Sequence, residues 1–200
     1  MERKLNIQAV LADGCALGFR NIINLLLMVL LYLITFWIPY LNVGTTIGFY
    51  KNIVALSYGE EVSPLSIFSR QNYRHLGDFF ILMGIQTAGI TAAAAFLLIP
   101  AFVMSLAWQF AMLIFVDKNV APLKALNVSF QATRGEKWAL FLVYLILYFA
   151  VILVSGLLGI IPVVGPYLAV IAALASVAII LGIEATLYRY FREKAENMPA

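Results

Sequence analysis

The chain has 200 residues, of which 64% are hydrophobic and only 12% are charged, and its mean hydropathy is +0.96. Soluble domains are about half apolar and about a quarter charged. A water-soluble fold of this composition could not cover its surface with polar groups. The composition therefore predicts an integral membrane protein and argues against an ordinary soluble domain.

The small numbers of charged, cysteine and histidine residues argue against several classes of function. The formal net charge is +3 and no Lys/Arg cluster accompanies it, so we expect no nucleic-acid partner. A single cysteine, Cys15, excludes an internal disulfide and a multi-cysteine metal site. Since His75 is the only histidine, neither a histidine metal cage nor a Ser-His triad is expected. We predict a protein that is not an enzyme and has no metal or cofactor.

Six apolar runs approach the length of about 20 residues that a membrane helix needs. The predicted spans are about 21–41, 43–58, 79–99, 101–116, 137–161 and 167–188. The second is short and contains Lys51 and Asn52, so a re-entrant or interfacial segment is the alternative for it. The predicted fold class is all-α, a polytopic helical bundle that forms a single membrane domain over residues 1–200.

The basic residues predict how these spans are oriented. All 13 Lys and Arg residues precede the first span, lie within the second, lie in alternate connections, or follow the sixth. The other connections, at 42–46, 99–101 and 162–166, carry no charge. Because Lys and Arg in short loops stay in the cytoplasm, we expect three hairpins in the inner membrane, with both termini cytoplasmic.

A recurring dipeptide suggests an internal repeat. The pairs Ile38-Pro39, Ile99-Pro100 and Ile161-Pro162 follow one another at spacings of 61 and 62 residues. Proline cannot continue a helix without losing a hydrogen bond, and it makes the preceding residue extended. Each pair is therefore predicted to mark a hairpin tip. Coincidence in so apolar a chain is the alternative explanation.

The predicted cytoplasmic segments also resemble one another. Val62-Ser63-Pro64-Leu65 matches Val120-Ala121-Pro122-Leu123, and apolar residues recur at helical spacing after each proline. Proline suits the first turn of a helix. We predict amphipathic interfacial helices at about 4–18, 64–76 and 122–134. The unit of interfacial helix, span, Ile-Pro turn and span would then occur three times.

Two charged residues fall inside predicted spans. Lys51 and Glu184 lie at similar predicted depth, so they are candidates for an intramembrane polar pair. A charge in hydrocarbon is costly and points to a partner or a function. A structural pair, snorkelling of Lys51 to the interface, and a substrate or proton site are the three interpretations. Small residues such as Gly156 and Gly159 are predicted to form packing faces between helices.

Several segments carry a resemblance to a known family. They are Gly48-Phe49-Tyr50-Lys51, Ile99-Pro100, the run Ala125…Ser129…Gly135-Glu136-Lys137…Leu140-Phe141, and Pro166-Tyr167. Together they resemble a poorly characterised family of bacterial six-helix membrane proteins, similar to the membrane domain of some glycerophosphoryl diester phosphodiesterases. Ala101 departs from that pattern, which often has glycine after Ile-Pro. The resemblance implies a six-helix fold without the catalytic barrel, and it implies no agreed activity.

Two functions remain open from the sequence. The first is a non-enzymatic scaffold or accessory protein that interacts with membrane lipids or another membrane protein at the cytoplasmic interface. Its candidate headgroup contacts are Arg70, Arg74, Lys124 and Arg134. The alternative is a transporter of a small molecule or lipid, with a site near Lys51 and Glu184.

Overall fold

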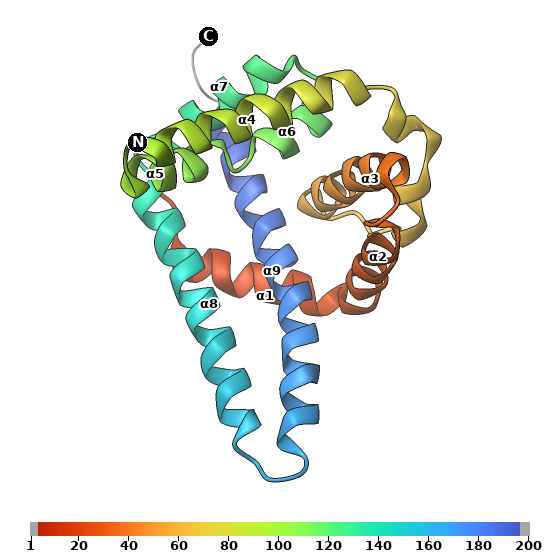
Figure 1. Ribbon diagram of the computed structural model, residues 1–200. Helices are drawn as coiled ribbons and strands as arrows, with labels where there is room; N and C mark the ends of the chain where they lie inside the picture. Colours follow the sequence, from red (N-terminus) through yellow and green to blue (C-terminus); the bar gives the residue numbers. More distant parts are fainter. Residues whose placement is uncertain (1–3, 197–200) are drawn as a thin grey trace.

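The computed structural model describes residues 4–196, which form helices joined by short connections (Figure 1). Arg3, one of the basic residues before the first predicted span, lies outside this range. In chain order the elements are α1 (Ile7–Arg20), α2 (Ile22–Thr35), α3 (Pro39–Ser57), the 3-10 helices η1 (Pro64–Phe68) and η2 (Arg70–Tyr73), α4 (Leu76–Phe96), α5 (Leu98–Trp108), α6 (Ala111–Lys118), α7 (Pro122–Ala132), α8 (Lys137–Gly159) and α9 (Gly165–Glu196). The predicted all-α class is confirmed.

Four segments are long and apolar enough to cross a membrane, among the residues that the structure describes. They are α4, the combined run Leu98–Lys118 of α5 and α6, α8 and α9. The pair α1 and α2 passes the same criterion together but is bent by 77° at Asn21, which would make a fifth. The six predicted spans are therefore only partly matched. The helix α3 does not meet this criterion because its polar residues, Lys51 among them, lower its mean hydropathy.

The Ile-Pro dipeptides lie at or next to helix breaks. Pro39 is the first residue of α3, after an extended Ile38, and Pro162 lies in the turn between α8 and α9. Pro100 instead sits inside the first turn of α5, because the chain breaks three residues earlier, at the extended Leu97. A first-turn proline loses no helical hydrogen bond, so helix α5 can begin before it.

The predicted cytoplasmic segments differ from one another. The stretch at 122–134 contains a regular helix, α7, which begins at Pro122 as the proline predicts. The stretch at 64–76 instead forms η1 and η2, which are short and separated by Ser69. Asn52 of α3 holds this segment: its amide donates to the Ser66 hydroxyl, and its Oδ1 accepts a hydrogen bond from the Ser63 backbone N–H. These tertiary hydrogen bonds favour two short turns over one continuous helix.

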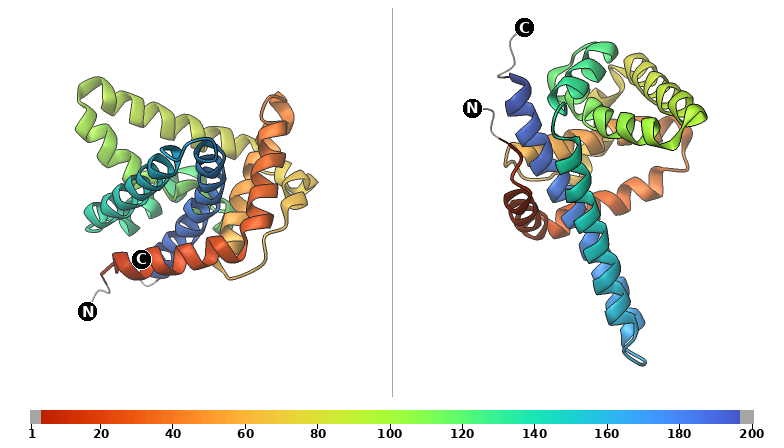
Figure 2. Two further views of the ribbon diagram at one scale, coloured as in Figure 1. Left: turned by 90° about the horizontal axis from the view of Figure 1, so that it is seen from below. Right: turned by 90° about the vertical axis from the view of Figure 1, so that its left-hand side faces the viewer.

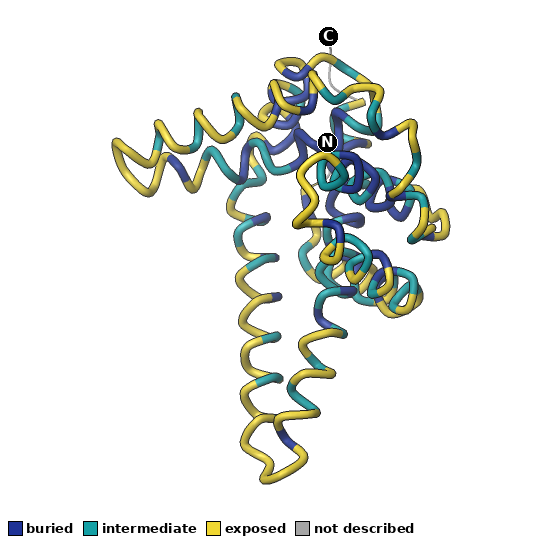
Figure 3. Tube along the Cα trace, turned by 45° about the vertical axis from the view of Figure 1, so that its right-hand side comes forward, coloured by how far each residue is buried: buried dark blue, intermediate teal, exposed yellow. Residues whose placement is uncertain are grey.

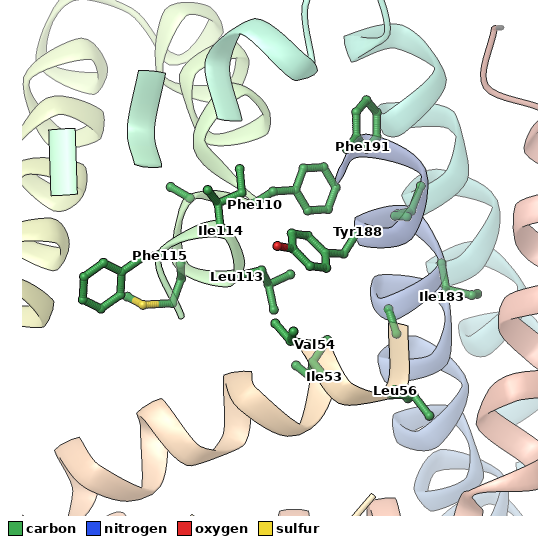
Figure 4. Packing of buried hydrophobic residues seen from close by; sticks show 14 of the residues in the cluster. Ile53, Val54, Leu56, Phe110, Leu113, Ile114, Phe115, Ile183, Tyr188 and Phe191 are labelled. Atoms are coloured by element: carbon green, nitrogen blue, oxygen red, sulfur yellow. The ribbon is translucent and has the colours of Figure 1, made fainter. Parts of the chain in front are cut away.

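The buried core lies where α3, α6 and α9 meet. Figure 4 shows Phe110 and Leu113 of the α6 region pointing toward Tyr188 and Phe191 of α9, with Ile53 of α3 below them. The rings of Phe110 and Phe191 are stacked with centroids 4.9 Å apart. Buried aromatic side chains contribute large apolar areas, so this junction joins three parts of the chain that are distant in sequence.

The helices α1 and α9 cross at glycines. Gly14 and Gly18 of α1 face Gly182 of α9, and all three are buried. A Cβ atom on Gly182 would lie 2.6 Å from the backbone nitrogen of Gly18. The two backbones are therefore in contact, as in the Gly-x-x-x-Gly packing of membrane helices. This contact places α9 beside the α1–α2 bend (Figure 1).

Two apolar hairpins project from the core. One comprises α8 and the first half of α9, and the other comprises α4 and α5; they leave the core in different directions (Figure 2). Both are largely exposed along their length, with the tip residues Phe96 and Val163 more than four-fifths exposed (Figure 3). Exposed apolar faces of this extent mark contact with lipid or with another protein.

Candidate functional site

The two charged residues predicted as a pair have separate partners. The Lys51 ammonium donates a hydrogen bond to Asn72 Oδ1 at 3.0 Å. Glu184 Oε2 accepts one from the Tyr144 hydroxyl at 2.5 Å and one from Gln109 Nε2 at 3.2 Å. The structure thus places Lys51 beside η2 and Glu184 between α8 and the α5–α6 junction, and it does not bring them together.

Asn72 positions the Lys51 ammonium. This buried side chain donates to the carbonyl oxygens of Ser66 and Ile67, at 3.2 and 3.0 Å, so that its Oδ1 atom is directed toward Lys51. It lies against Gly48 of α3, where any side chain would collide with it. A fully bonded buried amide holds a fixed orientation. The ammonium of Lys51 is therefore held at the junction of α3 and η2.

A tyrosine attaches the same segment to α3. The ring of Tyr73 covers Gly44 and stacks on Tyr40 with centroids 5.0 Å apart. Burial raises the pKa of the Tyr73 hydroxyl above its usual value, and the neighbouring Tyr40 raises it further. The side chain is therefore neutral, and η2 is fixed on α3 by aromatic packing as well as by Asn72.

A small polar cavity opens beside Lys51. It has a volume of about 190 Å³ and lies between α3, η2 and α6. Two cations, Lys51 and Arg74, line it together with His75, and no carboxylate is among the lining residues. The Asp78 carboxylate lies 3.8 Å from His75 Nδ1, but Asp78 is not among the lining residues. We call this the basic cavity.

The far wall of the basic cavity comes from the end of α6. Asn119 ends that helix in the left-handed conformation, with φ of 49°, and its amide N–H donates to the Phe115 carbonyl. Asparagine accepts this conformation more readily than most residues. The turn brings the polar Asn119 side chain opposite Gln71 and Asn72 in the lining. The cavity therefore combines the positive charges of Lys51 and Arg74 with the neutral amide side chains of Gln71 and Asn119, which can donate hydrogen bonds.

The other predicted headgroup contacts lie elsewhere. Arg70 is exposed at the start of η2, and Lys124 is exposed on α7. Lys124 lines a different, mostly apolar pocket, with Lys118 and Arg192. Arg134 is exposed after α7, and its carbonyl oxygen accepts a hydrogen bond from Lys194. Of the four predicted basic residues, only Arg74 shares a cavity with Lys51.

Glu184 belongs to a compact cluster inside the helix bundle. Besides its bonds to Glu184, Gln109 donates to the Tyr144 hydroxyl, so the three side chains are mutually bonded. Gln109 lies at the interruption between α5 and α6, after Trp108 and before Ala111. A carboxylate with two donors is well satisfied, and the cluster joins α8, α9 and the α5–α6 junction.

Sequence reasoning missed a third polar cluster, around Asp117. Its carboxylate accepts hydrogen bonds from the hydroxyls of Tyr188, at 2.7 Å, and Tyr58, at 3.1 Å. The guanidinium of buried Arg192 lies 3.6 Å from the centre of the Tyr58 ring and donates to Ser57. The members come from the ends of α3, α6 and α9 and are up to 135 residues apart. No local motif could have revealed them.

Neither the described cavities nor the polar clusters contain a set of metal ligands: among residues 4–196 no group of three or more His, Cys, Asp or Glu side chains could hold an ion. The resemblance to the membrane domain of phosphodiesterases stays a prediction. In comparisons with known proteins, no family model, no curated protein and no solved structure matches this chain.

Proposed function

We propose that this chain is a non-enzymatic integral membrane protein that binds the phosphate group of anionic lipids at the cytoplasmic face of the inner membrane. The basic cavity is the binding site, with Lys51 and Arg74 as its cations. The protein would thereby serve as a lipid-binding scaffold, to which another membrane protein can attach through the exposed hairpins.

The observation that carries this proposal is the composition of the cavity wall. Lys51 and Arg74 share a cavity of about 190 Å³ that no carboxylate lines. Two like charges at close range destabilise each other, and an anion between them removes that cost. Arginine offers planar paired donors and lysine a compact charge, and both are common ligands of phosphate. Basic pockets between membrane helices bind lipid headgroups for this reason.

The transporter alternative depended on a shared site at Lys51 and Glu184. The two residues have separate hydrogen-bond partners, and Glu184 does not line the basic cavity. Headgroup binding at Lys51 and Arg74 is therefore the function that the geometry supports best.

Replacing Lys51 and Arg74 tests the proposal. We expect the double variant Lys51→Gln and Arg74→Gln to lose selective binding of phosphatidylglycerol by about tenfold or more, because a hydrogen bond to a charged group contributes about 1.5–3 kcal/mol. The measurement is native mass spectrometry of the purified protein with phosphatidylglycerol and phosphatidylcholine in competition. Titration of inorganic phosphate by calorimetry, in parallel, distinguishes a lipid headgroup from free phosphate as the ligand.

A matched control is Arg20→Gln, which removes an exposed cation at the end of α1 that lines none of the described pockets. Unchanged lipid preference in this variant assigns the effect to the cavity rather than to net charge. Equal lipid preference in the wild type, the double variant and Arg20→Gln would refute the proposal.

We also propose that α2/α3, α4 with α5–α6, and α8/α9 form three membrane hairpins whose basic ends face the cytoplasm. The basic residues in alternate connections support this orientation. The proline at the start of η1 and of α7 supports repetition of the hairpin unit. Under this proposal, α3 crosses despite Lys51, which η2 shields at its cytoplasmic end.

Single cysteines on a Cys15→Ser background test this arrangement in intact cells. We expect Trp37→Cys and Ile160→Cys, at exposed hairpin tips, to react with a membrane-impermeant maleimide. Ser63→Cys and Lys124→Cys, at the basic ends, should react only after the membrane is permeabilised. Reaction of residues 37 and 160 from opposite sides of the membrane would show that α2 and α3 do not form a complete hairpin.

A further inference from the structure

A second cavity lies outside the proposed headgroup site. It is an apolar groove of about 760 Å³ between α5 and the first turn of α8. One wall is the face of α5 that contains Leu98, Phe102 and Val103, and the other is formed by Trp138 and Phe141. Its lining residues place the groove between α5, in the α4/α5 hairpin, and the start of α8.

Aromatic rings contribute to both walls of the groove. The ring of Phe141 lies edge-on to both Phe102 and Trp138, with centroids 5.5 and 6.0 Å apart. Trp138 is 79% exposed and Phe102 is 47% exposed, so these rings border the groove rather than fill it. An open apolar channel of this size falls within the range of ligand sites.

The groove lining carries one positive charge. Lys137 is the only charged residue of the lining. Its ammonium lies 4.9 Å from the centre of the Phe130 ring, and within the described part of the chain it makes no ion pair. The site therefore presents one cation beside an apolar channel, which is complementary to a ligand with an anionic head and a hydrocarbon tail.

We propose that this groove holds one acyl chain of an anionic phospholipid, whose phosphate group contacts Lys137. Its walls belong to α8 and to the combined run of α5 and α6, which are both long and apolar enough to span a membrane, so the walls suit a hydrocarbon chain. Lipid tails are as apolar as the groove walls, and the hydrophobic effect therefore does not select one lipid over another there. Selection comes from the Lys137 charge and from the fit of a chain against the aromatic walls. This inference does not depend on the basic cavity.

Fluorescence quenching of Trp138 by brominated lipid tests the proposal. Variants Trp37→Phe and Trp108→Phe leave Trp138 as the only tryptophan. The protein is placed in nanodiscs of phosphatidylcholine with an increasing fraction of phosphatidylglycerol that is brominated on its acyl chains. We expect half-quenching at a mole fraction about fivefold lower than with brominated phosphatidylcholine, as one basic residue near lipid headgroups implies.

Two substitutions separate the tail from the headgroup. Val103→Phe fills the groove and should abolish the early quenching. Val154→Phe adds the same bulk at a similarly exposed site on α8, outside the groove, and should leave it unchanged. Lys137→Gln should remove the preference for phosphatidylglycerol while the acyl chain still quenches. The proposal would be overturned if the two brominated lipids half-quenched Trp138 at the same mole fraction in the protein with an unsubstituted groove. It would also be overturned if Val103→Phe and Val154→Phe gave the same quenching curve.

Discussion

Replacement of Gly182 by alanine is expected to destabilise the fold by about 3 kcal/mol, at the upper end of the usual cost of overpacking. The added methyl group would meet the carbonyl oxygen of Gly14 and the backbone of Gly18. These are main-chain atoms that cannot rotate away, so α1 and α9 must separate. The measurement is resistance to unfolding by sodium dodecyl sulfate in mild detergent, followed by circular dichroism or tryptophan fluorescence.

Gly156→Ala is the matched control for that experiment. Gly156 also lies in an apolar helix, but no atom would be within 4 Å of the added methyl group. Because alanine favours helix by up to about 1 kcal/mol over glycine, this variant should be as stable as the wild type or more stable. If both variants unfolded at the same detergent concentration, the proposed contact between α1 and α9 would be refuted.

The glycine contact shows what the sequence could and could not predict about packing. Small residues permit close approach of helices, but they do not specify a partner. Gly156 and Gly159, predicted as a packing face, border open space. Gly14 and Gly18, at the spacing of a helix-packing motif, belong to a stretch predicted to lie along the membrane surface. The Gly-x-x-x-Gly motif is visible in the sequence, but only the structure shows that it packs against α9.

Helices could be predicted from long apolar runs, and the start of a helix could be predicted where a proline determines it. Long apolar runs predicted helices, and Pro39 and Pro122 begin α3 and α7. Departures arise where tertiary bonds prevail over local preference. Asn52 and Asn72 hold 64–76 as two 3-10 turns rather than one helix. The α5–α6 interruption similarly accompanies the bonds that Gln109 makes to α8 and α9.

The candidate site could be predicted only in part, because its residues meet through tertiary structure. Lys51 was identifiable as an unusual charge in an apolar segment, and Arg74 as a basic residue after η2. Nothing in the sequence indicated that both line one cavity, or that Asn119 closes it. The Lys51–Glu184 hypothesis relied on equal depth along two spans, which says nothing about rotation of the helices. In the structure the two residues have different hydrogen-bond partners, Tyr144 for Glu184 and Asn72 for Lys51.

Asp117→Ala is expected to cost about 1–3 kcal/mol of stability, because it leaves the buried hydroxyl of Tyr188 without its acceptor. Asp13→Ala is the matched control. The Asp13 carboxylate is 63% exposed and lies 3.9 Å from Arg189, whereas the Asp117 side chain is only 9% exposed. An exposed ion pair contributes about 1 kcal/mol or less, so the control should unfold close to the wild type.

A double-mutant cycle with Tyr188→Phe identifies the cause of this loss. If Asp117 acts mainly by satisfying the Tyr188 hydroxyl, its removal costs less once that hydroxyl is absent, and the double variant is more stable than the two single losses predict. We expect a coupling of about 1 kcal/mol or more between the two positions, measured by detergent-induced unfolding. Additive losses would instead assign the role of Asp117 to its other partners: the Tyr58 hydroxyl, from which it also accepts a hydrogen bond, and the Lys118 ammonium at 3.9 Å.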